Sequence, residues 1–237
     1  MKVTRRRSPS AEGGPREATT ERSHLRSPEG LIPPLAHEIG NLLAAMRLAG
    51  HLLGGPLEPE DRALLASEVE RLAAQAGALL ALLRPLLAPG ELARLAPREL
   101  LSALRRGVSD CVPEGVDLTV ASGRGLPDVR VDPDAVHHAL TALVLAAIEA
   151  VGADGRVRVT AAAEGRRVRL SLADDGPRFG PVELGNHTTR GRALVVELAD
   201  AVLRAGGGRA QLAAPRRGAR LEVWLPATPT GRRRPRA

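Results

Sequence analysis

The stretch Leu35-Ala36-His37-Glu38-Ile39-Gly40-Asn41-Leu42-Leu43 decides how the first part of the chain folds. It begins a heptad pattern, the spacing of a helix that packs against other helices. The apolar residues recur in alternating steps of four and three, at Leu35, Ile39, Leu42, Met46, Ala49 and Leu53. We expect this helix to begin after Pro33-Pro34 and to end at Gly54-Gly55-Pro56.

The polar residues of the same stretch fall outside the heptad seam. With Leu35 at position d, His37 falls at f, on the side away from the seam. Glu38 falls at g, at the flank, and Asn41 lies one turn beyond His37 on the outer side. Because outer faces of amphipathic helices are normally polar, spacing alone favours a solvated surface over a functional site.

A second helix repeats the pattern after acidic residues at 58–61, which favour a helix start. Its seam residues are Leu65, Val69, Leu72, Ala76, Leu79 and Leu83, and the pattern fades near Pro85. Two such helices joined by a short turn form an antiparallel hairpin. One hairpin leaves apolar surface uncovered, so we expect two of them to form a four-helix bundle in a homodimer.

The pattern changes after a helical connector at 92–110 into alternating strands and helices. We expect strands near 116–121, 129–131, 156–162, 167–172, 209–213 and 220–225, and helices near 133–151 and 193–204. Asp132 is the expected N-cap of the first of these helices. The second part is thus an α/β domain of about five strands and two or three helices. Its polar loop at 174–189 follows a strand, where ligands commonly bind.

The net charge of +7 resides entirely in the two ends of the chain. Residues 1–29 have no apolar period and are expected to be a disordered basic tail, and residues 229–237 an Arg-rich tail. The body between them is neutral, and Phe179 and Trp224 are its only aromatic residues besides histidine, which makes a nucleic-acid partner unlikely.

A single cysteine, Cys111, excludes an internal disulfide and a multi-cysteine metal site. The adjacent His137 and His138 diverge around a helix, so no metal site is predicted. No apolar run approaches the length of a membrane span and no signal peptide is recognisable, so we expect a cytoplasmic location.

The order of these parts resembles the transmitter module of two-component histidine kinases, from about residue 31 to 226. Residues 36–41 resemble the H-box, 126–133 the run that enters the N-box helix, and 172–177 the first glycine box. The resemblance implies a dimerisation and histidine-phosphotransfer hairpin at 30–92. It also implies a histidine-kinase ATPase domain, an α/β sandwich of Bergerat-like type, at 93–228.

The same resemblance assigns roles to the outer face of the first helix. His37 would be the phosphoacceptor, because a neutral imidazole is a competent nucleophile near pH 7. Glu38 would orient its ring and take up its proton. Asn41 would position a water against the phosphoaspartate of a response-regulator receiver domain, the implied partner.

The nucleotide side departs from the family pattern. Asp174, which would accept a hydrogen bond from the adenine amino group, is present, as are Gly176 and Gly191. Ala142 and Ala146 stand where the family has the N-box asparagines, and a methyl group cannot ligate magnesium. The glycine boxes are also eroded, since Arg178 replaces one glycine and the lid before Gly191 is short. ATP with magnesium is therefore expected to bind weakly or not at all, and no cofactor is certain.

Three hypotheses follow. In the first, His37 exchanges phosphate with a response-regulator aspartate, or assists its removal, with ATP binding impaired. In the second, the chain is a working autokinase with an atypical nucleotide site. In the third, it is a non-catalytic dimeric scaffold that uses its Arg-rich tails. The H-box spacing favours the first two, and the missing asparagines favour the first over the second.

Overall fold

The computed structural model describes residues 28–176, 187–213 and 218–228. The helices are α1 (Pro28–Leu53), α2 (Pro59–Leu87), α3 (Pro97–Val108), α4 (Pro133–Val151) and α5 (His187–Ala205), with a single 3-10 turn, η1 (Ser109–Cys111). The strands are β1 (Ala93–Leu95), β2 (Asp117–Ser122), β3 (Val129–Val131), β4 (Arg156–Glu164), β5 (Arg167–Asp174), β6 (Arg209–Ala213) and β7 (Ala219–Pro226). Apart from Pro28 and Glu29, the two predicted tails lie outside the described residues.

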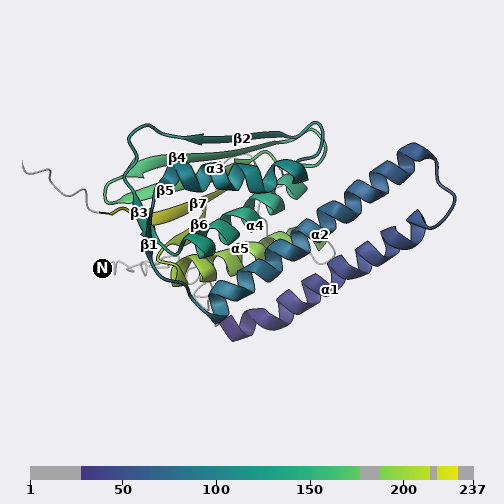
Figure 1. Ribbon diagram of the computed structural model, residues 1–237, viewed down its shortest axis with the longest axis horizontal. Coiled ribbons are helices and arrows are strands. Elements are labelled where there is room, and N and C mark those ends of the chain that lie inside the picture. Colours follow the sequence, from purple (N-terminus) through teal and green to yellow (C-terminus); the bar gives the residue numbers. More distant parts are fainter. Residues whose placement is uncertain (1–27, 177–186, 214–217, 229–237) are drawn as a thin grey trace, which may run out of the picture.

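Helices α1 and α2 form the predicted antiparallel hairpin, which projects from the α/β domain (Figure 1). In the turn, the N–H groups of Gly54 and Gly55 donate to the carbonyl oxygens of His51 and Leu52 at 3.2 and 3.0 Å. The heptad seam faces inward, since its buried members include Leu35, Leu42 and Ala49 on α1 and Leu72, Ala76 and Leu79 on α2. The other seam residues are half-buried.

Helix α1 begins earlier than predicted, at Pro28, with Pro33 and Pro34 inside it. A proline at these positions removes only the bonds to the carbonyl groups of residues 29 and 30, in the first turn of the helix. Leu31 and Leu35 are 3% and 2% exposed, so their burial holds this turn in place. The prolines therefore lie in the helix and do not precede it.

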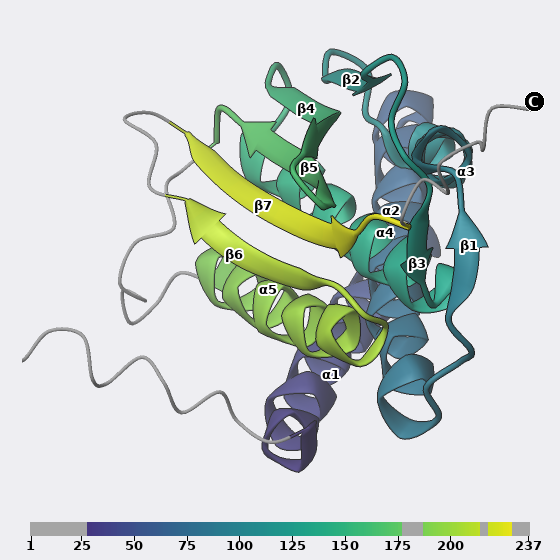
Figure 2. The same ribbon diagram turned by 90° about the vertical axis from the view of Figure 1, so that its left-hand side faces the viewer.

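The α/β domain is built on a five-stranded sheet in the order β2-β4-β5-β7-β6. The β2–β4 pair is parallel and the other pairs are antiparallel. Helices α4 and α5 cover one face of this sheet (Figure 2). Val157, Leu170 and Val223 illustrate the buried residues that alternate along the strands toward these helices.

Helix α4 is the central element of the core. Eleven of its residues are buried, nine of them in an almost unbroken run from Ala139 to Ile148. Among the described helices, α4 is the one that is long and apolar enough to cross a membrane, and 61% of its apolar window is buried inside the protein. The sequence prediction overlooked this apolar stretch, whose composition is explained by its position between the sheet, α3, α5 and the hairpin (Figure 2).

Asp132 connects the segment that follows the hairpin to the start of α4. Its Oδ1 accepts hydrogen bonds from the N–H groups of Asp134 and Ala135, both at 3.1 Å, which confirms the predicted N-cap. Its Oδ2 accepts from the N–H of Gly90 at 2.7 Å. The connector also contains β1, which the sequence did not predict and which pairs antiparallel with β3 in a separate two-stranded sheet. These contacts fix the exit from the hairpin against the α/β domain.

Helix α5 starts at His187 and not near residue 193 as predicted. Gly191 lies inside this helix, where one glycine costs only about 1 kcal/mol relative to alanine. Part of the predicted loop at 174–189 therefore lies in α5, and residues 177–186, including Arg178, lie outside the described residues.

Candidate functional site at the junction of hairpin and α/β domain

His37 and Asn41 lie exposed on the outer side of α1, as the heptad spacing predicts. Leu35 and Leu42, 2% and 9% exposed, hold the opposite side of the helix against its neighbours. The fold therefore presents an imidazole and an amide one helical turn apart on an accessible surface. This arrangement allows a second protein to approach His37.

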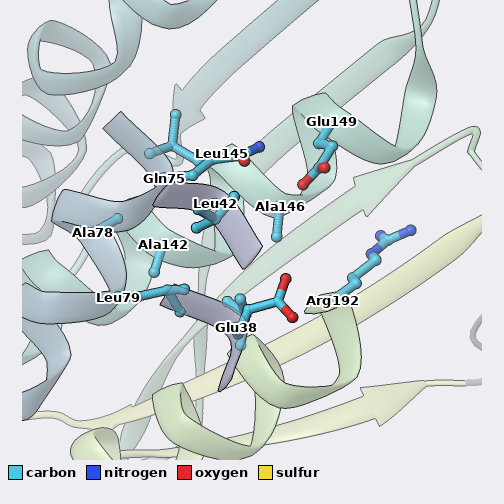
Figure 3. Close-up of a pocket in the computed structure, with 11 residues that line it drawn as sticks. Glu38, Leu42, Gln75, Ala78, Leu79, Ala142, Leu145, Ala146, Glu149 and Arg192 are labelled. Carbon is cyan, nitrogen blue, oxygen red and sulfur yellow. The ribbon is translucent and has the colours of Figure 1, made fainter. Parts of the chain in front are cut away.

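Glu38 faces the α/β domain instead. Its side chain lines a cavity of about 30 Å³ between the hairpin and helices α4 and α5. Figure 3 shows the Glu38 and Glu149 carboxylates directed into the same space, with Arg192 beyond them on α5. Glu38 is thus positioned at the junction of the two domains, next to both an acidic and a basic side chain.

Ala142 and Ala146, at the predicted N-box positions, also line this cavity (Figure 3). They are 3% and 7% exposed, and the facing residues from the hairpin include Leu42, Ala78 and Leu79. The remaining space would hold one or two water molecules. Pockets for small molecules usually measure about 300 Å³ or more. In this arrangement the hairpin covers the surface of α4 that carries the two alanines.

Asp174 ends β5, and both of its carboxylate oxygens have partners. Oδ1 accepts from the N–H of Gly176 at 3.1 Å, and Oδ2 accepts from the guanidinium of Arg192. The two side chains are 1% and 9% exposed, so this is a buried ion pair. Burial raises the pKa of the Asp174 carboxyl, and the contact with Arg192 opposes that rise.

The space beside Asp174 is almost filled. A cavity of about 10 Å³ separates Asp174 and Arg192 from apolar residues of α4, α5 and the sheet. Gly176 is required at the loop start, because a Cβ there would meet the carbonyl oxygen of Ala150 at 2.7 Å. Arg192 lines this cavity and the one at Glu38. One arginine therefore links the predicted nucleotide-binding carboxylate to the junction with the hairpin.

Glu149 and Arg71 connect the hairpin to α4 directly. The Arg71 Nη1 lies 3.7 Å from the Glu149 Oε1, and its Nε donates to the Glu68 Oε2 at 2.8 Å. Desolvation by burial raises the pKa of the Glu149 carboxyl, with Arg71 opposing this and the charges of Glu38 and Glu68 adding to it. The Glu149 side chain is 35% exposed, so its carboxylate is in contact with both the protein and solvent.

This raised pKa predicts a pH-dependent effect of Glu149→Gln. As pH rises above the ordinary value of 4.5, the unfolded chain loses the Glu149 proton before the folded chain does. In that window the parent therefore loses stability that the variant retains. Urea titrations at several pH values give the unfolding free energies of the variant and the parent. We expect the unfolding free energy of Glu149→Gln minus that of the parent to increase as pH rises from below 4.5, and then to become constant. A constant difference between Glu149→Gln and the parent across pH would contradict the assignment.

Of the predicted site residues, the structure brings Glu38 close to the nucleotide side of the α/β domain and leaves His37 and Asn41 on the opposite, exposed surface. Asp174 and Gly176 lie together at the end of β5. Gly191 belongs to the backbone of α5, and its surroundings lie outside the described part of the chain.

Comparison with known proteins agrees with this architecture. Residues 131–229 match the family of histidine kinase-, DNA gyrase B- and HSP90-like ATPases. Over 210 residues, the chain is 28% identical to the sensor histidine kinase ZraS of Escherichia coli O157:H7 and 27% identical to ZraS of Escherichia coli K12. Together, these matches support a histidine kinase transmitter module. These matches cover 83% of this transmitter module and 45% of each relative, so it spans less than half the length of those curated relatives.

Solved structures share the fold of the transmitter module. The catalytic domain of the histidine kinase ThkA superposes with a TM-score of 0.50 at 20% identity, over 59% of this chain and 98% of that one. ThkA in complex with the response regulator protein TrrA superposes with a TM-score of 0.55 at 18% identity, over 84% of this chain and 61% of that one.

Sequence reasoning missed two of the residues that shape this site. Arg192 carries no motif, and only the fold brings it to Asp174, 18 residues away in the chain. Arg71 lies among alternating charges on α2 and could be matched with Glu149 only once the packing of α2 on α4 was known. Both residues are arginines with a carboxylate partner from another element, a relation that local sequence does not encode.

Proposed function

We propose that this transmitter module carries phosphate on His37 and exchanges it with an aspartate of a response-regulator receiver domain. The observation that supports this most is the exposure of His37 and Asn41 on one outer face of α1. A receiver domain could reach both residues there without entering the junction with the α/β domain. A response-regulator partner is proposed by analogy with ThkA, whose structure was solved in complex with TrrA.

The chemistry needs only a nucleophile, a proton acceptor and access. A ring nitrogen of His37 attacks the phosphorus of a phosphoaspartate, the bond from phosphorus to the aspartate oxygen breaks, and the receiver carboxylate leaves. Glu38 is assigned to ring orientation and proton uptake. Because Glu38 lines the cavity shared with Glu149, the packing of the α/β domain would govern its availability. In the reverse direction, or with water positioned by Asn41, the same face would return or remove phosphate.

The proposal includes impaired ATP binding. Two features support it: the hairpin covers Ala142 and Ala146, and Arg192 occupies an oxygen of the Asp174 carboxylate. The alanines offer no oxygen ligand for magnesium. A nucleotide would have to displace both the hairpin contact and a buried ion pair, which makes its binding unfavourable. The α/β domain is then best understood as a platform that holds the hairpin.

The autokinase alternative is favoured by one observation, the match of the chain to proteins named sensor histidine kinases. It requires the α/β domain to move away from the hairpin and Arg192 to leave Asp174. It predicts magnesium-dependent labelling of His37 from ATP, which the phosphotransfer proposal does not.

A homodimer is part of the proposal, because the hairpin has a second apolar face. Next to the buried seam, and sharing Ile39 and Met46 with it, α1 carries an apolar stripe at Ile32, Ala36, Ile39, Leu43 and Met46. Helix α2 carries another, which shares Val69, Ala76 and Leu83 with its seam and adds Ala73, Leu80 and Leu87. Ile32, Leu43, Leu80 and Leu87 are 48%, 51%, 51% and 75% exposed, which is unusual for residues of this size. Both stripes keep the steps of three and four that suit a four-helix bundle.

We expect the double variant Leu43→Glu/Leu80→Glu to be monomeric in sedimentation equilibrium, while the parent sediments as a dimer. Carboxylates buried at this interface would lose hydration without gaining partners, so dimer affinity should fall by at least 100-fold, about 3 kcal/mol. Leu64→Glu, at an exposed position outside the stripes, is the matched control and should stay dimeric. A dimeric double variant would contradict this interface.

Transfer from a phosphorylated receiver domain tests the function directly. The purified module is mixed with receiver domains that have been labelled with radioactive acetyl phosphate and freed of that donor. We expect acid-labile, base-stable label on the module, as for phosphohistidine, with matching loss from its cognate receiver. If no receiver of the host's response regulators gives or takes phosphate, the proposal is wrong.

A further inference from the structure

The face of the sheet opposite α4 and α5 carries arginines on neighbouring strands. The structure describes no helix against this face (Figure 2). Arg158 on β4 pairs in register with Ala173 on β5, which pairs with Arg220 on β7. Two strand spacings put the Arg158 and Arg220 backbones about 10 Å apart, with only alanine between them. Both arginines are exposed.

A second row adds an aromatic residue. Arg169 on β5 is opposite Trp224 on β7, and Trp224 is opposite Arg209 on β6. The guanidinium carbon of Arg209 lies 4.8 Å from the centre of the Trp224 ring, in a cation–π contact. We call Arg158, Arg169, Arg209, Arg220 and Trp224 the arginine face. It joins the chain's only tryptophan to four cationic side chains.

The acidic groups near this face offset only part of its charge. Glu222, 7% exposed, lies between the two rows, accepts from the Ser171 hydroxyl at 3.1 Å and has an oxygen 3.5 Å from the Arg169 Nη1. Glu164, the last residue of β4, has a carboxylate oxygen 2.8 Å from the Arg169 Nε. Among the described residues, Arg158, Arg209 and Arg220 have no carboxylate within ion-pair distance. The exposed charge is therefore positive, although the body of the chain is neutral overall.

We infer that the arginine face is a docking surface for a protein partner that presents an acidic surface. Tryptophan and arginine are the residue types most enriched in the energetic centres of protein interfaces. Unpaired guanidiniums around such a centre favour a carboxylate-bearing partner. A single aromatic ring, already stacked by Arg209, gives little platform for nucleic-acid bases. This inference concerns a different surface from His37 and does not depend on phosphotransfer.

The lone tryptophan makes this surface directly observable in the full-length chain. The chain has no tyrosine, so its emission reports Trp224. We expect a short poly-L-glutamate peptide, added at low salt, to change Trp224 emission in a saturable way, and added salt to weaken the effect. Peptide that binds, by fluorescence polarisation of a labelled end, without changing Trp224 emission would place binding elsewhere and overturn the inference.

Charge reversal gives the decisive comparison. Arg158→Glu/Arg220→Glu should weaken peptide binding by about tenfold or more, because two attractions become repulsions. Arg105→Glu/Arg106→Glu reverses two exposed charges on α3 and is the matched control, expected to bind like the parent. Equal weakening in both variants would mean that only net charge matters and would contradict a defined face. Random-sequence duplex DNA or phosphatidylserine vesicles that change Trp224 emission at lower concentration than poly-L-glutamate would likewise overturn a protein partner.

Discussion

The His37→Gln variant is expected to accept no phosphate from a phosphorylated receiver domain. A glutamine amide is polar and of similar reach but has no nucleophilic ring nitrogen, so the phosphorus cannot be transferred to it. Because His37 is exposed, the substitution should change the unfolding free energy by less than about 0.5 kcal/mol. Acid-labile label after incubation with a labelled receiver is the measurement, and the loss should be complete.

His51 provides the matched control. It is exposed in the last turn of the same helix and has no predicted role. His51→Gln should accept phosphate like the parent. If His37→Gln were still labelled, the acceptor would be another group and the assignment from the H-box would be wrong, whatever the labelling of the control.

The Arg192→Met variant should lose roughly 3–5 kcal/mol of stability, because it leaves the Asp174 carboxylate buried without its cation. Methionine keeps much of the apolar stem, so the loss reports the ion pair more than packing. Urea denaturation of parent and variant is the measurement. An apolar replacement of both partners, Arg192→Met/Asp174→Leu, should recover most of the loss.

Arg204→Ala is the control for this prediction. Arg204 lies on the same helix and pairs with Asp200 at 2.8 Å, but 54% of its side chain is exposed. The Asp200 Oδ1 also keeps its bond from the N–H of Ala210 at 2.7 Å. Removal of the Arg204 side chain should therefore lower the unfolding free energy by about 1 kcal/mol or less. A similar cost for Arg192→Met would show that the buried pair does not hold α5 to the sheet.

The hairpin was predictable because periodicity and burial coincide there. The seam that starts at Leu35 fixes which side of α1 is buried, and that in turn places His37 and Asn41 outside. The strands at 129–131 and 209–213 and helix α4 were predicted with the bounds that the structure has. In each, local pattern and tertiary environment favour the same structure.

The rest depends on contacts between distant parts of the chain. β1 is three residues long and forms only because β3 lies beside it. The pairing of Asp174 with Arg192 depends on where α5 packs, and the arginine face depends on strand order, since Arg158 and Arg220 are 62 residues apart in sequence. Net charge, which is neutral for the body, conceals that local concentration of arginine.

Incubation with γ-labelled ATP and magnesium most directly separates phosphotransfer from autokinase activity. The same preparation, labelled in parallel from a phosphorylated receiver domain, shows that His37 is able to accept phosphate. With ATP we expect no acid-labile label above that of His37→Gln, because Ala142 and Ala146 supply no magnesium ligand and Arg192 holds Asp174. Acid-labile label from ATP on the parent, absent from His37→Gln, would contradict this account and make the module an autokinase.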